Sequence, residues 1–306
     1  SEMCIRDRMR KVIPFLLSFC LCVGLCACSS QKDYPTKYKD SQAKTISDVL
    51  DTSFPKTDVI SDGSIALVDT TNASQGYIGC QLLSDPGSKV KLIVEKDDKK
   101  YTYDIDTTEM VGIPLSCGSG DYSIRIAQNM EGTTYSIIAS GQINVQLADD
   151  KLPFLYPNKI VNYHRDSQVV SLSMEVCKKD TNDLERIESI YSYVLKHLTY
   201  DKKKAKAADN QYMLPDLDEV LKTGKGICFD YASLMAAMCR VQGIPCRVVV
   251  GATDIEYHAW CEIYLKGKGW INPKVYFKAK KWSLVDPTFA DSGNDYEGKY
   301  QEDYHY

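Results

Sequence analysis

The periodicity of apolar residues changes once along this chain, near residues 148–165, and the change divides the sequence into two predicted domains. Across residues 59–148, short apolar runs are separated by turn-forming residues, and in several runs apolar and polar residues alternate as in β-strands. From Ser167 onward, apolar residues recur every three or four positions, as on one face of a helix. Pro153 and Pro157 limit regular structure in between, so we place the boundary between residues 148 and 149.

Residues 59–148 contain seven or eight short runs rich in β-branched and aromatic residues. This number and spacing are typical of an antiparallel β-sandwich, of which the immunoglobulin fold is one form. The Cys–Trp–Cys signature of true immunoglobulin domains is absent, so the prediction covers the sandwich architecture alone. Cys80 and Cys117 are candidates for a disulfide between the sheets. The segment has no histidine, and we expect it to act as a spacer or a binding module.

The second half of the chain predicts helices followed by strands. Apolar residues have helical spacing over 182–198, and shorter helices are expected over 216–221 and 228–242. The run Lys202–Lys204 is interpreted as a solvated loop. Helices followed by antiparallel strands indicate an α+β domain over residues 149–306. The strand-like runs are 247–251, 258–265, 269–271, 275–277 and 282–286.

The N-terminal residues have the pattern of a secretion signal. A basic segment at residues 9–11 precedes sixteen uncharged residues, 12–27, which are fewer than the ~20 that a helix needs to cross a bilayer. The stretch ends in Leu25-Cys26-Ala27-Cys28, which resembles the bacterial lipobox, whose cysteine is acylated and becomes the mature N-terminus. Residues 1–27 are therefore predicted to be a signal peptide, with residues 1–8 as extra residues before Met9. An uncleaved Cys-rich anchor is the alternative.

The lipobox resemblance implies a lipid on Cys28, a polar tether over residues 28–58, and a location on the extracytoplasmic face of a bacterial cell membrane. The lipid would then be the contact with the membrane. The formal net charge of the chain is −4, so it has no basic field to attract nucleic acid, and nucleic-acid partners are excluded.

The cysteine pattern does not resemble a metal site or a dense disulfide framework. Seven of the 12 cysteines follow Cys28, and an odd number leaves at least one free thiol. No Cys-x-x-Cys pair occurs among them, so a structural zinc site is not expected, and no metal or organic cofactor is predicted. The seven are Cys80, Cys117, Cys177, Cys228, Cys239, Cys246 and Cys261.

Cys228 has the sequence surroundings of a nucleophile. Gly224 and Gly226 precede it in the chain and allow the backbone to place it in the first turn of the helix at 228–242. There, unpaired N–H groups and the helix dipole favour thiolate over thiol. His258 begins a predicted strand and is the candidate base. Asp286 ends another predicted strand and would orient the imidazole if the two strands pair.

Three sequence blocks resemble the core of the transglutaminase-like superfamily, which is related to papain-type cysteine enzymes. They are GKGICFDYASLMAAMCRVQGIPCRVVVG, HAWCEIYL and WSLVDPTF, within residues 182–289. The resemblance implies a papain-like domain with a catalytic triad of Cys228, His258 and Asp286. The chain departs from the family at Cys261, where relatives often have asparagine, and residues 272–281 look inserted.

Two classes of function follow from these residues. In the first, a surface enzyme attacks protein or peptide amides through Cys228, and the acceptor is water in a protease or amidase, or an amine in cross-linking. The backbone N–H of Cys228 would be one oxyanion donor, and a side-chain donor, Tyr200 or Tyr212, is left open. In the second, the chain is a non-catalytic binding or scaffolding lipoprotein, and Cys228 is a structural thiol. Thiol reactivity near neutral pH discriminates between them.

Overall fold

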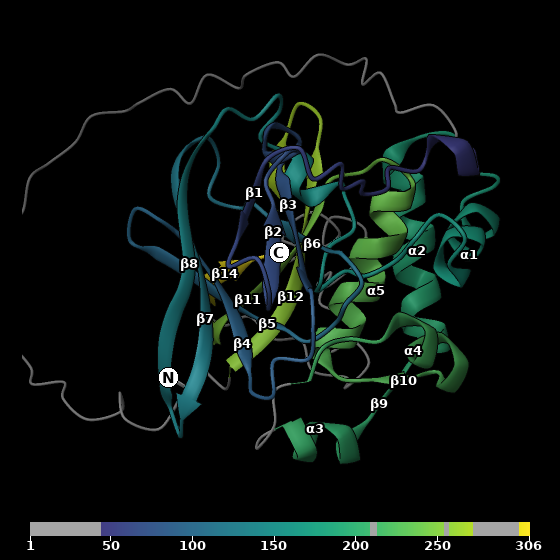
Figure 1. Cartoon of the computed structure of the whole chain (residues 1–306). Helices are drawn as coiled ribbons and strands as arrows, with labels where there is room; N and C mark the ends of the chain where they lie inside the picture. The colour runs from purple at the N-terminus through teal and green to yellow at the C-terminus, as the bar shows by residue number, and fades with distance from the viewer. Residues whose placement is uncertain (1–43, 209–212, 254–256, 272–299) are drawn as a thin grey trace, which may run out of the picture.

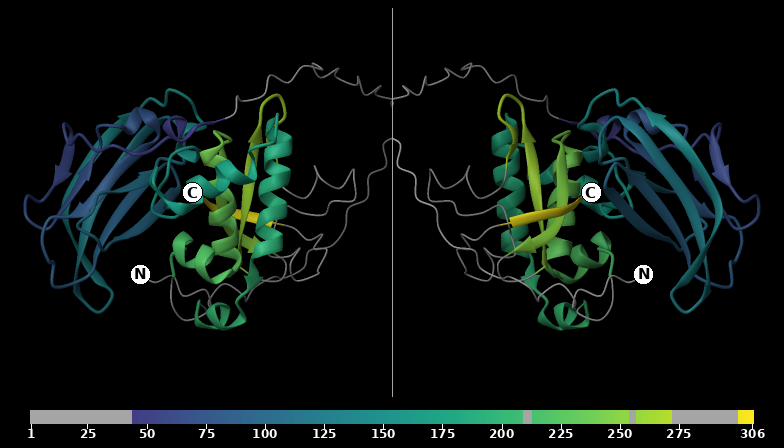
Figure 2. Two further views of the ribbon diagram at one scale, coloured as in Figure 1. Left: turned by 90° about the vertical axis from the view of Figure 1, so that its right-hand side faces the viewer. Right: turned by 90° about the vertical axis from the view of Figure 1, so that its left-hand side faces the viewer.

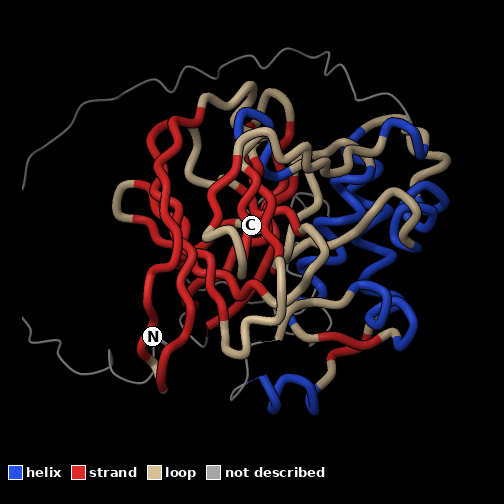
Figure 3. The backbone as a smooth tube through the Cα atoms, viewed as in Figure 1, coloured by secondary structure: helices blue, strands red, loops and turns tan. Residues whose placement is uncertain are grey.

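The structure, a computed structural model, describes residues 44–208, 213–253, 257–271 and 300–306. A β-rich part formed by residues 59–145 packs beside a part in which helices cover a separate antiparallel sheet (Figures 1 and 3). The predicted α+β class is confirmed. Within the described ranges, no helix is both long and apolar enough to cross a bilayer.

Two four-stranded antiparallel sheets form the β-rich part, which is therefore a sandwich. One sheet has the strand order β1-β2-β3-β6 and the other has the order β5-β4-β7-β8. In β4, Val90, Leu92 and Val94 are buried in the shared core, and the residues between them are only partly buried, as strand alternation requires. The strands are β1 (Val59–Ser61), β2 (Ala66–Asp69), β3 (Tyr77–Leu82), β4 (Val90–Lys96), β5 (Lys99–Ile105), β6 (Val111–Pro114), β7 (Gly120–Glu131) and β8 (Thr134–Val145).

The sandwich has free thiols at the two cysteines that were candidates for a disulfide. Cys80 is buried in β3, and burial raises the pKa of its thiol to about 12. Cys117 is partly exposed, and it also carries a free thiol. The apolar core, rather than a disulfide between these residues, therefore holds the two sheets together.

Helix α5 is the central element of the mixed part. It packs against β11 and β12 and against α1, α2 and α4, and every residue from Asp230 to Val241 is buried. The sheet has the order β13-β12-β11-β14. The expected helices and first three strands match the structure, whereas the runs at 275–277 and 282–286 lie outside the described residues. The elements are α1 (Gln168–Val176), α2 (Asp183–His197), α3 (Lys202–Ala208), α4 (Leu217–Thr223), α5 (Cys228–Val241), β11 (Cys246–Thr253), β12 (Tyr257–Leu265), β13 (Gly269–Ile271) and β14 (Tyr300–His305), with β9 (Thr199–Tyr200) and β10 (Lys225–Gly226) as a separate pair.

Two segments join the parts. Residues 44–58 fall within the predicted tether, yet Val49 is buried in the core of the mixed part, and Phe54 packs edge-on against Tyr77 of β3 with ring centroids 5.9 Å apart. Residues 28–43 of that tether lie outside the described residues. At the other end, Tyr304 of β14 packs against Tyr101 of β5 at 5.3 Å between centroids. The sandwich and the helical part therefore share an interface (Figure 2).

His305 lies at this junction as a neutral imidazole. Arg247 of β11 approaches Nδ1 at 3.2 Å, and Nε2 lies 2.8 Å from Glu302. A ring that accepts a hydrogen bond from the guanidinium at Nδ1 and donates at Nε2 is the neutral form. Burial, followed by the charge of Arg247, lowers the pKa of His305 to about 4, with Glu262 and Lys99 as further charged neighbours.

The stability of the fold should therefore fall on acidification between about pH 6.5 and pH 4. In this window the unfolded chain binds a proton at His305 and the folded chain does not, so the loss should be about 1–3 kcal/mol. Urea denaturation at a series of pH values measures it. In His305→Gln the loss should be smaller by that amount, since carboxylates titrate alike in both proteins. Parallel curves for the two proteins would show that His305 is not held neutral.

Candidate active site

A short parallel pairing holds the residues before Cys228. Strand β10 pairs with β9, which follows α2. The N–H of Asp201, the residue after β9, donates to the carbonyl of Gly226 at 2.8 Å. The loop that presents Cys228 is therefore fixed from one side by hydrogen bonds of the main chain.

Gly224 and Gly226 are required by backbone geometry. Gly224 has φ 64° and ends α4 in the left-handed region that favours glycine. A Cβ on Gly226 would lie 2.7 Å from the Cβ of Asp230, so a side chain there would displace the start of α5. Both positions thus set the path of the chain toward Cys228.

Cys228 is the first residue of α5 and is partly exposed. Ile227, the N-cap residue, has no side-chain acceptor for the N–H groups of the first turn. Its own N–H donates to Oδ2 of Asp230 at 2.8 Å, which is one half of a capping box. The first turn therefore has backbone N–H groups without helical acceptors next to the thiol. Such groups stabilise the negative charge of a thiolate or of an oxyanion.

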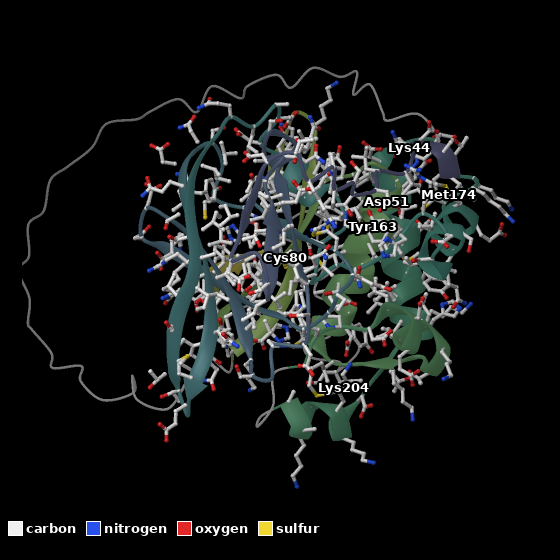
Figure 4. All side chains as sticks on the ribbon, viewed as in Figure 1. Lys44, Asp51, Cys80, Tyr163, Met174 and Lys204 are labelled. Carbon is white, nitrogen blue, oxygen red and sulfur yellow. The ribbon has the colours of Figure 1, made fainter. Side chains whose placement is uncertain are left out.

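Lys204 covers the carboxylate of Asp230. Its Nζ lies 2.7 Å from Oδ2 and 2.8 Å from Oδ1, and only 1% of Asp230 is exposed. Lys204 belongs to α3, so the interpretation of Lys202–Lys204 as a solvated loop is wrong. In Figure 4, Lys204 lies between α3 and the body of the domain. Sequence reasoning missed both members of this pair.

His258 is buried near the beginning of β12, where it pairs with Gly251 of β11. Two contacts show that α5 and β12 run in the same direction. The Sγ of Cys261 lies 2.9 Å from the carbonyl of Ala232, and further along both elements Arg240 donates to Cys246, the strand partner of Ile263. Cys228 and His258 therefore begin two adjacent elements at the same end.

Cys261, the position of the departure from the family pattern, is a packing residue. It is fully buried in the core cluster with residues of α5, and its thiol contacts the carbonyl of Ala232. Cys261 lies three positions after His258 in β12.

Of the predicted triad, the structure describes Cys228 and His258, and Asp286 lies outside the described residues. The triad therefore stays a prediction. Tyr200, one candidate oxyanion donor, lies in β9 opposite Gly226. Tyr212, the other candidate, lies outside the described residues.

The thiols differ in their exposure. Cys228 and Cys117 are partly exposed, and burial raises the pKa of Cys117 above its ordinary value. The other thiols are buried, and burial raises the pKa of Cys177 to about 12. Among described residues, Cys228 is thus the accessible thiol that begins a long helix. No group of three His, Cys, Asp or Glu side chains in those residues could hold a metal ion. The buried thiols are Cys80, Cys177, Cys239, Cys246 and Cys261.

Comparison with known proteins gives matches in the same part of the chain. The family model for the transglutaminase-like superfamily matches residues 170–287. Mouse kyphoscoliosis peptidase is 31% identical over 131 residues, which are 39% of this chain and 18% of that protein. The uncharacterized protein YebA of Bacillus subtilis (strain 168) is 24% identical over 150 residues, 42% of this chain and 20% of that protein. The chain thus spans about a fifth of the length of these curated relatives.

Among solved structures, the periplasmic domain of TgpA from Pseudomonas aeruginosa matches with a TM-score of 0.34 and 14% identity, covering 75% of this chain and 95% of that one. The match to the family model runs from α1 past α5 and the paired strands β11 and β12, and it includes Cys228, His258 and Asp286. Residues 170–287 therefore form a domain of the transglutaminase-like superfamily.

Proposed function

We propose that this chain is a cysteine-nucleophile enzyme that acts on amides of proteins or peptides at a bacterial cell surface. The observation that carries the proposal is the position of Cys228. It is the accessible thiol at the start of the central helix, and α5 begins at the same end as the strand of His258. Such an arrangement supplies a nucleophile and a base.

In the first step, His258 takes the proton of Cys228 and the thiolate attacks the carbonyl carbon of the amide. The negative oxygen of the tetrahedral intermediate accepts a hydrogen bond from the backbone N–H of Cys228, which has no helical acceptor. The C–N bond then breaks, the leaving amine takes the proton from His258, and a thioester remains on Cys228. Asp286 is the proposed partner that orients the imidazole throughout.

In the second step, water attacks the thioester, His258 takes its proton, and the carboxylic acid product leaves as the thiol is restored. We favour water over an amine because a relative that matches this domain, mouse kyphoscoliosis peptidase, is named as a peptidase. An amine acceptor would use the same residues and give a cross-link instead, so the choice lies in the second step alone.

The proposed location follows from the N-terminal segment. Cys28, once acylated, would hold the enzyme at the extracytoplasmic face of the membrane, and substrates would be proteins or peptides within reach of that surface. The anchor is a lipid because the protein as a whole is acidic and gains nothing from an anionic membrane surface.

Trapping of the acyl-enzyme tests the reaction and the anchor in one preparation. Full-length protein, extracted from bacterial membranes, is mixed with a peptide library, quenched in acid and mapped by mass spectrometry. We expect an acyl adduct on Cys228 that an added amine discharges to an amide, and an N-terminus at Cys28 that carries lipid. His258→Ala should abolish the adduct. If no peptide gives an adduct, or the adduct lies on another cysteine, the acyl-transfer proposal fails. Retention of residues 1–27 would refute the anchor.

A further inference from the structure

The buried ion pair behind Cys228 is the feature that the proposed reaction leaves unused. Asp230 lies two residues after Cys228 in the first turn of α5 and is 1% exposed. Its carboxylate caps the N–H of Ile227, so it cannot turn away from the start of the helix. A negative charge fixed at this place opposes the formation of a second one on the Cys228 thiol.

Lys204 supplies the opposing charge. Its ammonium contacts both oxygens of Asp230, at 2.8 and 2.7 Å, and its side chain is 22% exposed. Asp201 holds α3 in place by accepting the N–H groups of Lys203 and Lys204, both at 2.9 Å, through Oδ1. The same Asp201 donates its N–H to Gly226 in the loop before Cys228. The lysine and the nucleophile loop are thus tied to one residue.

We propose that Lys204 is a positioning residue for the nucleophile, which neutralises Asp230 so that the carboxylate can cap α5 without opposing the thiolate of Cys228. The inference rests on the proposed function only in naming Cys228 as the nucleophile. The carboxylate gives the helix its cap, and the lysine removes the electrostatic cost of that cap to the reaction. Lys204 acts through Asp230 and does not touch the substrate.

The other charged or titratable groups around the start of α5 come from four elements or loops. Lys225 in β10 is exposed, and Asp201 is partly exposed. Tyr200 lies in β9, opposite Gly226, and His258 lies in β12, which packs on α5. Among the described side chains, Lys204 is the cation that contacts both oxygens of the Asp230 carboxylate. Its removal is therefore the most direct way to expose that charge.

The test is the rate of alkylation of Cys228 by iodoacetamide as a function of pH, followed by peptide mapping in the full chain. Lys204→Met should slow alkylation about tenfold at pH 6 and move the midpoint of the pH profile upward, because the uncompensated carboxylate in the same helical turn then opposes the thiolate by Coulomb repulsion. Lys204→Arg should retain the wild-type profile. Lys203→Met is the matched control, because Lys203 is exposed on the same helix, and its profile should not change.

Two variants separate charge from folding. Asp230→Asn removes the carboxylate and keeps an oxygen that can accept the N–H of Ile227, so alkylation should be no slower than in the wild type. Lys204→Met combined with Asp230→Asn should restore the wild-type midpoint. If Lys204→Met has the profile of Lys203→Met, or if the double variant stays as slow as Lys204→Met, the proposal is overturned. Should Lys204→Met fail to fold, the Asp230→Asn and double-variant profiles decide the matter.

The assay needs no substrate, so its outcome is separate from that of the proposed reaction. Normal profiles for all of these variants, together with an acyl-enzyme on Cys228, would leave the reaction in place and remove the role of Lys204. The predicted profiles without any acyl-enzyme would retain that role and remove the reaction.

Discussion

Replacement of Cys228 by alanine should reduce amide cleavage by a factor of about 10⁴ or more, because the thioester has no other place to form. The free energy of unfolding should change by less than about 1 kcal/mol, since the side chain is partly exposed and its thiol packs little surface. Turnover of a peptide found by the trapping experiment and a thermal melt of the same sample measure the two effects.

Cys117→Ala is the matched control for that variant. Cys117 is also partly exposed, but it lies in the β-sandwich part, so its loss should leave turnover unchanged. If Cys228→Ala retains turnover within tenfold of the wild type, or loses stability while the chemistry is intact, Cys228 is a structural thiol. The binding-protein interpretation would then be the better one.

Replacement of Arg240 by methionine should destabilise the fold by about 3–5 kcal/mol, the largest stability effect that we expect from a single polar residue. Arg240 is 1% exposed, and its guanidinium donates to the carbonyls of Cys246, Tyr156 and Tyr306 at 2.8–2.9 Å. Methionine fills similar space but leaves these buried carbonyls without their donor. The transition should move by roughly 6–15 °C in a thermal melt.

Lys222→Met provides the comparison for Arg240. Its ammonium pairs with Glu219 at 3.3 Å, but the side chain is 78% exposed, so the pair contributes little. Equal melting temperatures for Arg240→Met and Lys222→Met would show that the Arg240 hydrogen bonds do not stabilise the fold. Arg240→Lys should fall between them, because one ammonium cannot reach three separate carbonyls.

The sequence predicts the helices and strands whose apolar residues recur with a regular local spacing. Helices α2 and α5 and strands β4, β11 and β12 have apolar residues with helical or alternating spacing, or as nearly continuous runs, and the structure has them where they are expected. Residues Tyr300–His305 have no such pattern, and β14 forms because it pairs with β11 and covers part of the sandwich. Pairing between distant segments is a tertiary effect that local spacing cannot reveal.

In the candidate site, too, some residues are predictable from local sequence and others are not. Cys228 and His258 can be found from the sequence because glycines, a helix start and a strand start surround them. Asp230 is the acidic residue of a capping box, but an isoleucine at the N-cap hides the usual signature, which begins with serine or threonine. Lys204 lies in a lysine run that is typical of a solvated surface. Its role depends on the placement of α3 by Asp201, which only the structure shows.

Site-resolved alkylation at pH 6 is the most direct measurement of the central claim that Cys228 is the reactive thiol. Native full-length protein is treated with limiting iodoacetamide, and the extent of modification is measured at each of the seven cysteines after Cys28. We predict that Cys228 reacts first, that Cys117 follows much more slowly because burial raises the pKa of its thiol, and that His258→Ala slows the reaction at Cys228 alone. Modification of Cys117 at the rate of Cys228, or a rate at Cys228 that does not depend on His258, would contradict the account.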